Sequence, residues 1–299
     1  MNILLIGHEG YLGRGLSSYL SRNHCVIGWD KREDIFKLDA AMLLRGKIEM
    51  LINLSVMTDR QASTFTVDEP CDQINVGGAR HLANILKGSE ISWIQMSTRE
   101  VLGPVYQAKD VIKTDAGLRP AWLVGEDQPY APANFYAKSK IMAEFISESH
   151  PYSAVIRLAT CYTDYDHPFG NWIVTLIKSA VRSMPVHITR GGEQFRDPLH
   201  IDDLGNLIER IHGKKTFGEK FHAGGGGGNL ISLKEMVHIV DSEANIQEIP
   251  GGDYGFAFNN QKATKLTGWE PKISFRERIP VIVKNIRQGI IHPLSVVSG

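Results

Sequence analysis

The stretch that decides the predicted fold is Met-Asn-Ile-Leu-Leu-Ile-Gly-His-Glu-Gly-Tyr-Leu-Gly-Arg-Gly, residues 1–15. Residues 2–6 form a short apolar run that stops at a glycine, which is typical of a buried parallel strand. Glycines then recur at every third position, where an apolar helical pattern begins. Glycine allows a tight turn and close approach of a ligand, and the amides at a helix start attract an anion. We therefore predict a phosphate-binding turn made by Gly7, Gly10, Tyr11, Leu12 and Gly13.

A second apolar run, residues 25–29, follows the predicted helix and ends at Asp30. A carboxylate at the end of the second strand of such a unit can accept hydrogen bonds from an adenosine ribose. Because that carboxylate would repel a 2′-phosphate, the sequence favours NAD over NADP as the cofactor. Lys31 and Arg32 follow directly and could pair with such a phosphate, so NADP stays possible.

Composition narrows the class of protein. The chain has 299 residues, and its 33 Lys and Arg balance 33 Asp and Glu, so charge gives no hint of nucleic acid or an anionic membrane. Its three cysteines are far apart and suit a reducing compartment, and neither they nor the histidines have metal-ligand spacing. The first strand begins at residue 2, and no apolar run could span a bilayer. We expect a soluble, cytoplasmic protein without a metal.

Apolar strands alternate with helical segments over the first half of the chain, which predicts βαβ units and a doubly wound parallel sheet of the Rossmann-type α/β class. Ligands of such sheets bind at the carboxyl ends of the strands. The predicted strands are residues 2–6, 25–29, 35–38, 50–54, 91–96 and 154–158, and the predicted helices here are 72–86 and 134–149.

The second half of the chain is less regular. We expect a dinucleotide-binding domain over residues 1–162, with return segments within 186–223, and a smaller C-terminal α/β substrate-binding lobe over 163–299. Residues 104–125 are predicted to be a long irregular loop that could cover the pocket, and the glycine run 224–228 a flexible loop. Later helices are predicted at 172–181, 202–211, 232–240 and 276–287, and short strands at 186–188 and 220–222.

Chemically active side chains gather between the fifth predicted strand and the next helix. Ser97 and Thr98 come just after the strand, and Tyr136 and Lys140 lie four residues apart on one helix face. A nearby ammonium favours the phenolate form of a tyrosine, and a threonine hydroxyl can share the hydrogen bonds of a substrate oxygen. The pattern therefore predicts that Thr98, Tyr136 and Lys140 serve hydride transfer at a carbinol carbon.

Together these motifs resemble the extended short-chain dehydrogenases/reductases, the NAD-dependent epimerase/dehydratase family that acts on nucleotide sugars. The resemblance covers nearly the whole chain. The matching stretches are GHEGYLG (7–13), LD (38–39), NLS (53–55), INVGG (74–78), STREVLG (97–103), YAKSK (136–140), FRDPLHIDD (195–203) and GWEP (268–271).

The resemblance implies further site residues. Lys140 would also hold the nicotinamide ribose, and Arg196 would pair with the sugar-nucleotide diphosphate or, structurally, with Asp197 or Asp202. Family members often form homodimers through the helices at 72–86 and 134–149. Further cofactor contacts are implied for Asp39, Leu54, Ser55 and Asn75, and substrate contacts for Ser97, Thr98, Arg99, Glu100, Thr160, Asn171 and Arg196.

Departures from the family pattern bear on the reaction. Sugar dehydratases of the family carry Asp-Glu after the catalytic threonine, and this chain has Arg99-Glu100, which disfavours dehydration. Thr160 stands where asparagine is usual, which affects substrate contact and leaves the hydride-transfer residues intact. The resemblance thus implies an NAD(P)-dependent nucleotide-sugar epimerase. An NAD(P)H-dependent 4-keto-sugar-nucleotide reductase and a non-catalytic NAD(P)-binding sensor or scaffold remain as alternatives.

Overall fold

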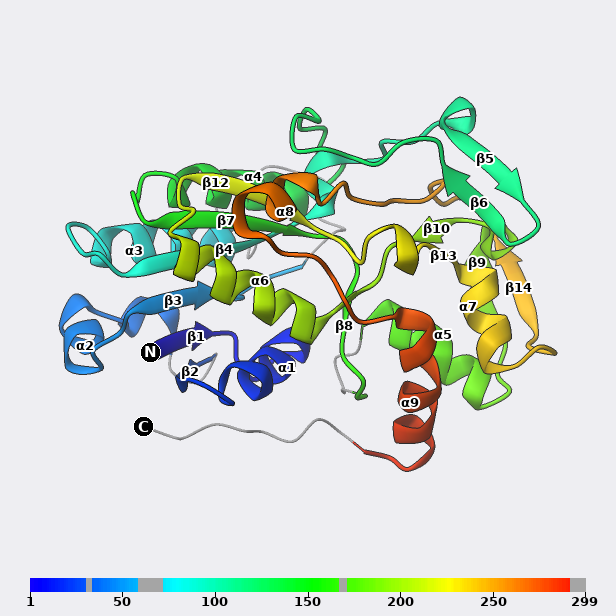
Figure 1. Ribbon diagram of the computed structural model, residues 1–299, viewed down its shortest axis with the longest axis horizontal. Coiled ribbons are helices and arrows are strands. Elements are labelled where there is room, and N and C mark those ends of the chain that lie inside the picture. Colours follow the sequence, from blue (N-terminus) through cyan, green and yellow to red (C-terminus); the bar gives the residue numbers. More distant parts are fainter. Residues whose placement is uncertain (31–33, 59–71, 167–170, 291–299) are drawn as a thin grey trace.

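A computed structural model describes residues 1–30, 34–58, 72–166 and 171–290 (Figure 1). Its centre is a six-stranded parallel sheet with the order β12-β7-β4-β3-β1-β2. The strand order reverses between β1 and β3, which places the expected ligand crevice at the carboxyl ends of these two strands. The strands are β1 (Asn2–Ile6), β2 (Cys25–Trp29), β3 (Met50–Asn53), β4 (Ser92–Thr98), β7 (Ser153–Leu158) and β12 (Glu219–Ala223).

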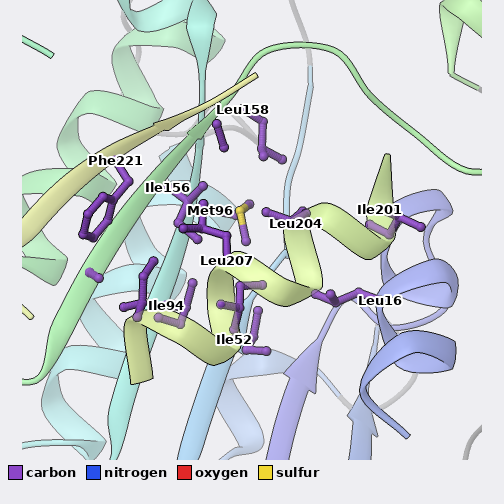
Figure 2. Close-up of a cluster of buried hydrophobic side chains, with 14 of the residues drawn as sticks. Leu16, Ile52, Ile94, Met96, Ile156, Leu158, Ile201, Leu204, Leu207 and Phe221 are labelled. Atoms are coloured by element: carbon purple, nitrogen blue, oxygen red, sulfur yellow. The ribbon is translucent and has the colours of Figure 1, made fainter. Parts of the chain in front are cut away.

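Helices cover both faces of this sheet. On one face α1 (Tyr11–Leu20) and α6 (Ile201–Lys214) pack on the strands, and Figure 2 shows Leu204 of α6 beside Met96 and Leu207 near Ile156. The other face is covered by α2 (Ala40–Arg45), α3 (Gly78–Ile85) and α4 (Phe135–Ser147). The predicted doubly wound Rossmann-type α/β fold is confirmed.

The C-terminal part of the chain has a second apolar core. Helices α5 (Trp172–Val181), α7 (Leu233–Val240) and α9 (Phe275–Arg287) form it with the parallel strand pair β9 (Val186–Thr189) and β14 (Ile246–Ile249). Figure 1 shows this group beyond the β8 connection, at the end of the sheet where the strands terminate. Other short elements are β8 (Cys161–Tyr162), β10 (Phe195–Arg196), β11 (Leu199–His200), β13 (Ile231–Ser232) and α8 (Gln261–Thr267).

Two predicted elements are wrong. Residues 35–38 do not form a strand, because Ile35–Lys37 is a single 3-10 turn capped by the Asp34 carboxylate. Ile35 and Leu38 are buried while the residues between them are exposed, which is a helical rather than a strand period. Residues 104–125 are not an irregular loop either, because they contain the antiparallel hairpin β5 (Val111–Thr114) and β6 (Gly117–Pro120).

The predicted helix at residues 72–86 has an unusual start. Its first segment, Asp72–Gly77, is π-helical, and only then does α3 begin. The glycine run forms a turn in which a Cβ on Gly225 would lie 2.0 Å from the Pro198 carbonyl oxygen. With residues 258–261 and 270–274 it lines a cavity of about 480 Å³, to which no predicted catalytic residue contributes.

Within the described ranges, every helix is too short or too polar to cross a lipid bilayer.

Candidate active site

The turn after β1 can only be made by glycines. Gly7 has a φ of +84°, and a Cβ on Gly13 would lie 2.0 Å from the Gly7 carbonyl oxygen. Helix α1 starts with Gly10 as its N-cap residue, and glycine has no side chain that could cap the first turn. The first turn of α1 therefore carries no side-chain cap at the end that faces the glycine turn. This arrangement fits a dinucleotide pyrophosphate.

Two other strand ends meet this turn. The Asp30 carboxylate, just after β2, accepts a hydrogen bond from the Glu9 amide at 2.8 Å. The backbone of Leu54 and Ser55, just after β3, lies so close that a Cβ on Gly7 would be 3.1 Å from the Leu54 carbonyl carbon. These predicted cofactor residues therefore gather at the point where the strand order reverses. Lys31 lies outside the described residues.

Asp39 and Asn75 have structural partners. Asp39 is exposed and caps α2 by accepting the Met42 amide at 2.6 Å. Asn75 exchanges hydrogen bonds of 2.9 Å with the Met57 backbone and donates to Ser139 Oγ on α4 at 2.9 Å. Both side-chain polar atoms of Asn75 are therefore engaged in holding α4 against the segment after β3.

Helix α4 presents the predicted catalytic pair on one buried face. Its N-cap is Asn134, whose side chain accepts the Ala137 amide at 2.8 Å. Tyr136 is 7% exposed and Lys140 is 3% exposed. Burial lowers the pKa of Lys140 to about 8, and the nearby Glu144 carboxylate opposes that shift. The helix therefore places an amino group with a lowered pKa one turn after the phenol, on the same buried face.

Hydrogen bonds join this helix to the end of β4. The side-chain Nδ2 of Asn134 donates to Glu100 Oε2 at 3.0 Å, and the Glu100 backbone amide donates to Thr98 Oγ1 at 3.3 Å. One residue earlier, Ser97 Oγ donates to Glu144 Oε1 at 2.5 Å. Thr98 is therefore held at the same edge of the sheet as the start of α4. Ser97, a predicted substrate contact, and Glu100 both have protein partners here.

The sequence analysis did not predict the buried hydrogen-bonded cluster around Glu144, one turn after Lys140 on α4. Glu144 is fully buried and accepts hydrogen bonds from Arg157 Nε and Nη2, at 3.0 and 2.8 Å, and from Tyr130 Oη at 2.7 Å. Burial disfavours the charge on Arg157, yet the hydrogen bonds to Glu144 outweigh it and raise its pKa. The available signals were Glu144 one turn after Lys140, and a charged residue inside the apolar strand β7.

On the C-terminal side, Arg196 of β10 meets Arg99 across one carboxylate. Arg196 Nη2 lies 2.9 Å from Asp253 Oδ1, and Arg99 Nη1 lies 3.4 Å from Asp253 Oδ2. The structural partners expected for Arg196 were wrong. Instead of forming an ion pair with Arg196, Asp197 accepts the Phe258 amide and Asp202 pairs with Arg22.

Thr160 and Asn171, two predicted substrate contacts, lie in the connections around β8. Thr160 is 5% exposed, and its carbonyl oxygen accepts the Leu199 amide at 2.8 Å. Asn171 is the N-cap residue of α5, where it accepts the Ile173 amide at 3.1 Å and donates to the Cys161 carbonyl oxygen. The Asn171 side chain is thus used in positioning α5.

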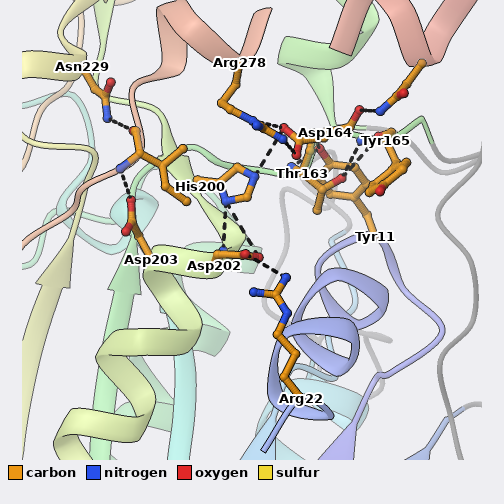
Figure 3. Close-up of polar contacts among 12 residues, drawn as sticks. Tyr11, Arg22, Thr163, Asp164, Tyr165, His200, Asp202, Asp203, Asn229 and Arg278 are labelled. Atoms are coloured by element: carbon orange, nitrogen blue, oxygen red, sulfur yellow. Dashed lines mark hydrogen bonds and ion pairs between the residues drawn. The ribbon is translucent and has the colours of Figure 1, made fainter. Parts of the chain in front are cut away.

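A polar network connects the phosphate turn to the C-terminal helices (Figure 3). Tyr11 Oη accepts the Thr163 amide at 2.8 Å, so this side chain joins α1 to the segment after β8. The next residue, Asp164, binds Arg278 of α9 and lies 3.4 Å from His200 Nε2. Burial opposes ionisation of Asp164, but hydrogen bonds from His200 and Arg278 outweigh it and lower its pKa to about 2.

Across the ranges that the structure describes, no three His, Cys, Asp or Glu side chains are grouped to hold a metal ion.

A glycine turn at a helix start, a parallel sheet with reversed strand order and a buried Tyr/Lys face are typical of dinucleotide-binding α/β folds. The sequence profile of the family described as "RmlD substrate binding domain" matches residues 1–248, and the chain belongs to this family. The predicted resemblance to extended short-chain dehydrogenases/reductases of the epimerase/dehydratase group is confirmed.

Individual relatives are more distant. UDP-glucuronic acid decarboxylase 2 from Arabidopsis thaliana is 26% identical over 227 residues, which cover 72% of this chain and 49% of that protein. The match thus spans about half the length of that relative. Two solved structures share 21% identity and a TM-score of 0.79. They are dTDP-glucose 4,6-dehydratase from Bacillus anthracis with NAD, covering 99% of this chain and 100% of that one, and UDP-glucuronic acid 4-epimerase from Bacillus cereus with UDP-glucuronic acid and NAD, covering 96% and 99%. At this identity the likeness concerns the fold.

Proposed function

We propose that this protein is an NAD(P)-dependent nucleotide-sugar epimerase, which removes a hydride from a sugar carbinol carbon and returns it to the other face. The observation that carries the proposal is the buried Tyr136–Lys140 face of α4, tied by Asn134 and Glu100 to the strand end that holds Thr98. The phosphate turn lies at the carboxyl edge of the same sheet, so cofactor and substrate would meet there. Relatives and structural neighbours with epimerase names agree with this reaction class.

The cofactor of this proposal is NAD. Gly7, Gly10 and Gly13 would accept its pyrophosphate, and Asp30 would accept the ribose hydroxyls. A carboxylate held 2.8 Å from the Glu9 amide, at the rim of the turn, would repel the 2′-phosphate of NADP. Structural neighbours that were solved with NAD bound agree with this choice.

Separate residues of the chain transfer the proton, hold the reacting oxygen and bind the substrate. Bound NAD would supply the hydride acceptor and donor. Tyr136 takes the proton from the sugar hydroxyl and later returns it, while Thr98 holds the same oxygen. Lys140 favours the phenolate by its charge and would hold the nicotinamide ribose. Arg196 binds the diphosphate of the substrate through its guanidinium Nε, which has no hydrogen-bond partner among the described residues.

Replacing Tyr136 with phenylalanine tests the mechanism. We expect Tyr136→Phe to lower kcat by at least about 100-fold, because the general base is lost, and to change the Kd of NAD less than about threefold. A steady-state turnover assay measures kcat, and calorimetric titration with NAD measures the Kd. Retained activity would show that Tyr136 is not the base.

The nucleotide released from the purified protein separates the alternatives. Protein prepared without added cofactor is denatured, and the released nucleotide is identified by chromatography. Stoichiometric NAD or NADH supports an epimerase, which recycles its cofactor in place. An empty protein that consumes NADPH only with a 4-keto nucleotide sugar is a reductase. Dinucleotide binding without turnover of any nucleotide sugar identifies a sensor or scaffold.

The proposal also includes the roles of the two parts of the chain and the oligomeric state. Residues 1–162 bind the dinucleotide and residues 163–299 mainly bind the substrate, in a cytoplasmic enzyme. The protein forms a homodimer through α3 and α4, because Met142 and Phe145 on α4 are 46% and 50% exposed and would be covered by a second copy. Light scattering on the purified protein measures this, and a monomer at micromolar concentration would contradict it.

A further inference from the structure

The proposed reaction assigns no role to Arg99, a residue of the site. It follows Thr98 directly, so its side chain starts at the reacting end of the substrate and not at the nucleotide. Its guanidinium lies 3.4 Å from Asp253 and 5.0 Å from the ring centroid of Phe256. Arg99 therefore extends from the end of β4 to the segment at residues 253–258, and its side chain remains 23% exposed.

Arg196 binds the Asp253 carboxylate from β10, and one of its N–H donors has no acceptor among the described residues. Its Nη2 pairs with Asp253 and its Nη1 donates to the Phe195 carbonyl oxygen at 2.7 Å. Its Nε is buried and has no hydrogen-bond partner among the described residues. A buried N–H without an acceptor is energetically unfavourable, so a ligand oxygen would be favoured at this position.

The charges around Asp253 do not balance. Besides Asp253, the carboxylate facing the two guanidiniums is Asp197, whose Oδ2 accepts the Phe258 amide at 2.9 Å. Burial raises the pKa of Asp197 to about 7, against the opposing influence of that hydrogen bond and both arginines. Burial and the like charge of Arg99 lower the pKa of Arg196 to about 10, although Asp253 opposes the shift. Among the described residues, Asp253 is thus the carboxylate that forms ion pairs with both guanidiniums.

We propose that Arg99 binds a carboxylate on the sugar, so that the substrate class is a nucleotide sugar of the uronic acid type. The inference rests on the proposed function, and within it the two arginines have different tasks. Arg196 serves the diphosphate through its unpaired Nε, whereas Arg99, next to Thr98, reaches a substituent beside the reacting carbon. Asp253 holds the two guanidiniums apart and in place. A planar guanidinium matches a carboxylate with two parallel hydrogen bonds.

Calorimetric titration of the NAD-loaded protein tests this assignment. The probes are UDP, UDP-glucose and UDP-glucuronate, with the corresponding dTDP compounds in parallel. We expect the wild type to bind the glucuronate about 10- to 100-fold more tightly than the glucose compound, as a charged hydrogen bond predicts. Arg99→Met should bring this ratio close to one, and Arg99→Lys should keep part of the preference.

A matched control is Arg119, which is also 23% exposed and is paired with Glu235 at 3.0 Å. Arg119→Met should leave the ratio at its wild-type value. Equal binding of the glucose and glucuronate compounds by the wild type would overturn the carboxylate assignment while leaving the proposed function standing. Equal weakening of UDP and the glucuronate in Arg99→Met would assign Arg99 to the diphosphate. Failure of every nucleotide and nucleotide sugar to bind would overturn the proposed function itself.

Discussion

Arg157 in β7 and Arg196 in β10 are both buried, with exposed fractions of 2% and 7%, yet their surroundings differ. Arg157 has its own carboxylate, because three of its hydrogen bonds go to Glu144. Arg196 shares Asp253 with Arg99 and keeps an unpaired Nε. The pKa of Arg157 is raised and that of Arg196 is lowered to about 10.

The difference separates two uses of a buried guanidinium. A fully satisfied ion pair between strand and helix stabilises the fold around the catalytic helix, and removing one partner leaves a buried charge behind. An incompletely satisfied arginine costs stability in the free protein and gains its missing partner when a ligand binds. Stability measurements on single variants can therefore tell the two apart.

The largest effect is expected at Arg157. Arg157→Met leaves the Glu144 carboxylate buried without its cation, which should lower the free energy of unfolding by about 3–5 kcal/mol. Urea denaturation measures it. In the double variant Glu144→Gln/Arg157→Met, part of the loss should return, because the carboxylate is removed together with its guanidinium partner. A loss below about 1 kcal/mol in the single variant would refute the comparison.

An intermediate effect is expected at Asp164, which is paired with Arg278 and His200. Its pKa of about 2 in the fold lies below the unfolded value near 4, so its contribution is complete above about pH 5 and is lost as the pH falls through 4 toward 2. Asp164→Asn should cost about 1–2 kcal/mol at pH 7 and almost nothing at pH 2. Urea denaturation at several pH values tests this, and a pH-independent difference would contradict it.

A smaller effect on stability is expected at Arg196. Arg196→Met should change the free energy of unfolding by less than about 1 kcal/mol, because a desolvated cation is removed and Asp253 keeps Arg99 as its partner. Affinity for UDP and for nucleotide sugars should fall at least about 10-fold. A loss of stability as large as that of Arg157→Met would make Arg196 a structural residue.

The smallest effect is expected at Arg119, whose pair with Glu235 is partly exposed. Arg119→Met should lower the free energy of unfolding by no more than about 0.5 kcal/mol, and less still at high salt, because water screens exposed ion pairs. Urea denaturation at low and high ionic strength measures this. A loss above about 1 kcal/mol would show that exposure does not rank these ion pairs.

Much of the fold and part of the site could be predicted from the sequence, because their signals are local. The glycine spacing, the apolar strands and the offset between Tyr136 and Lys140 each lie within a few residues of one another. The resemblance to the epimerase/dehydratase family rests on motifs of the same kind. The prediction of a strand at residues 35–38 was wrong because so short a segment fits the strand period and the helical period equally well.

The sequence by itself thus determined the parallel sheet, the phosphate turn and the face of α4, since period and spacing decide which side chains share a strand end or a helix face. Only the tertiary structure decided the partners of buried charges. Glu144 and Arg157 lie 13 residues apart, and Arg99 and Asp253 lie 154 residues apart (253 − 99). Such pairs form because a buried charge is stable only beside a counter-ion. Which residue supplies the counter-ion depends on how distant segments pack, and the local sequence pattern does not contain this information.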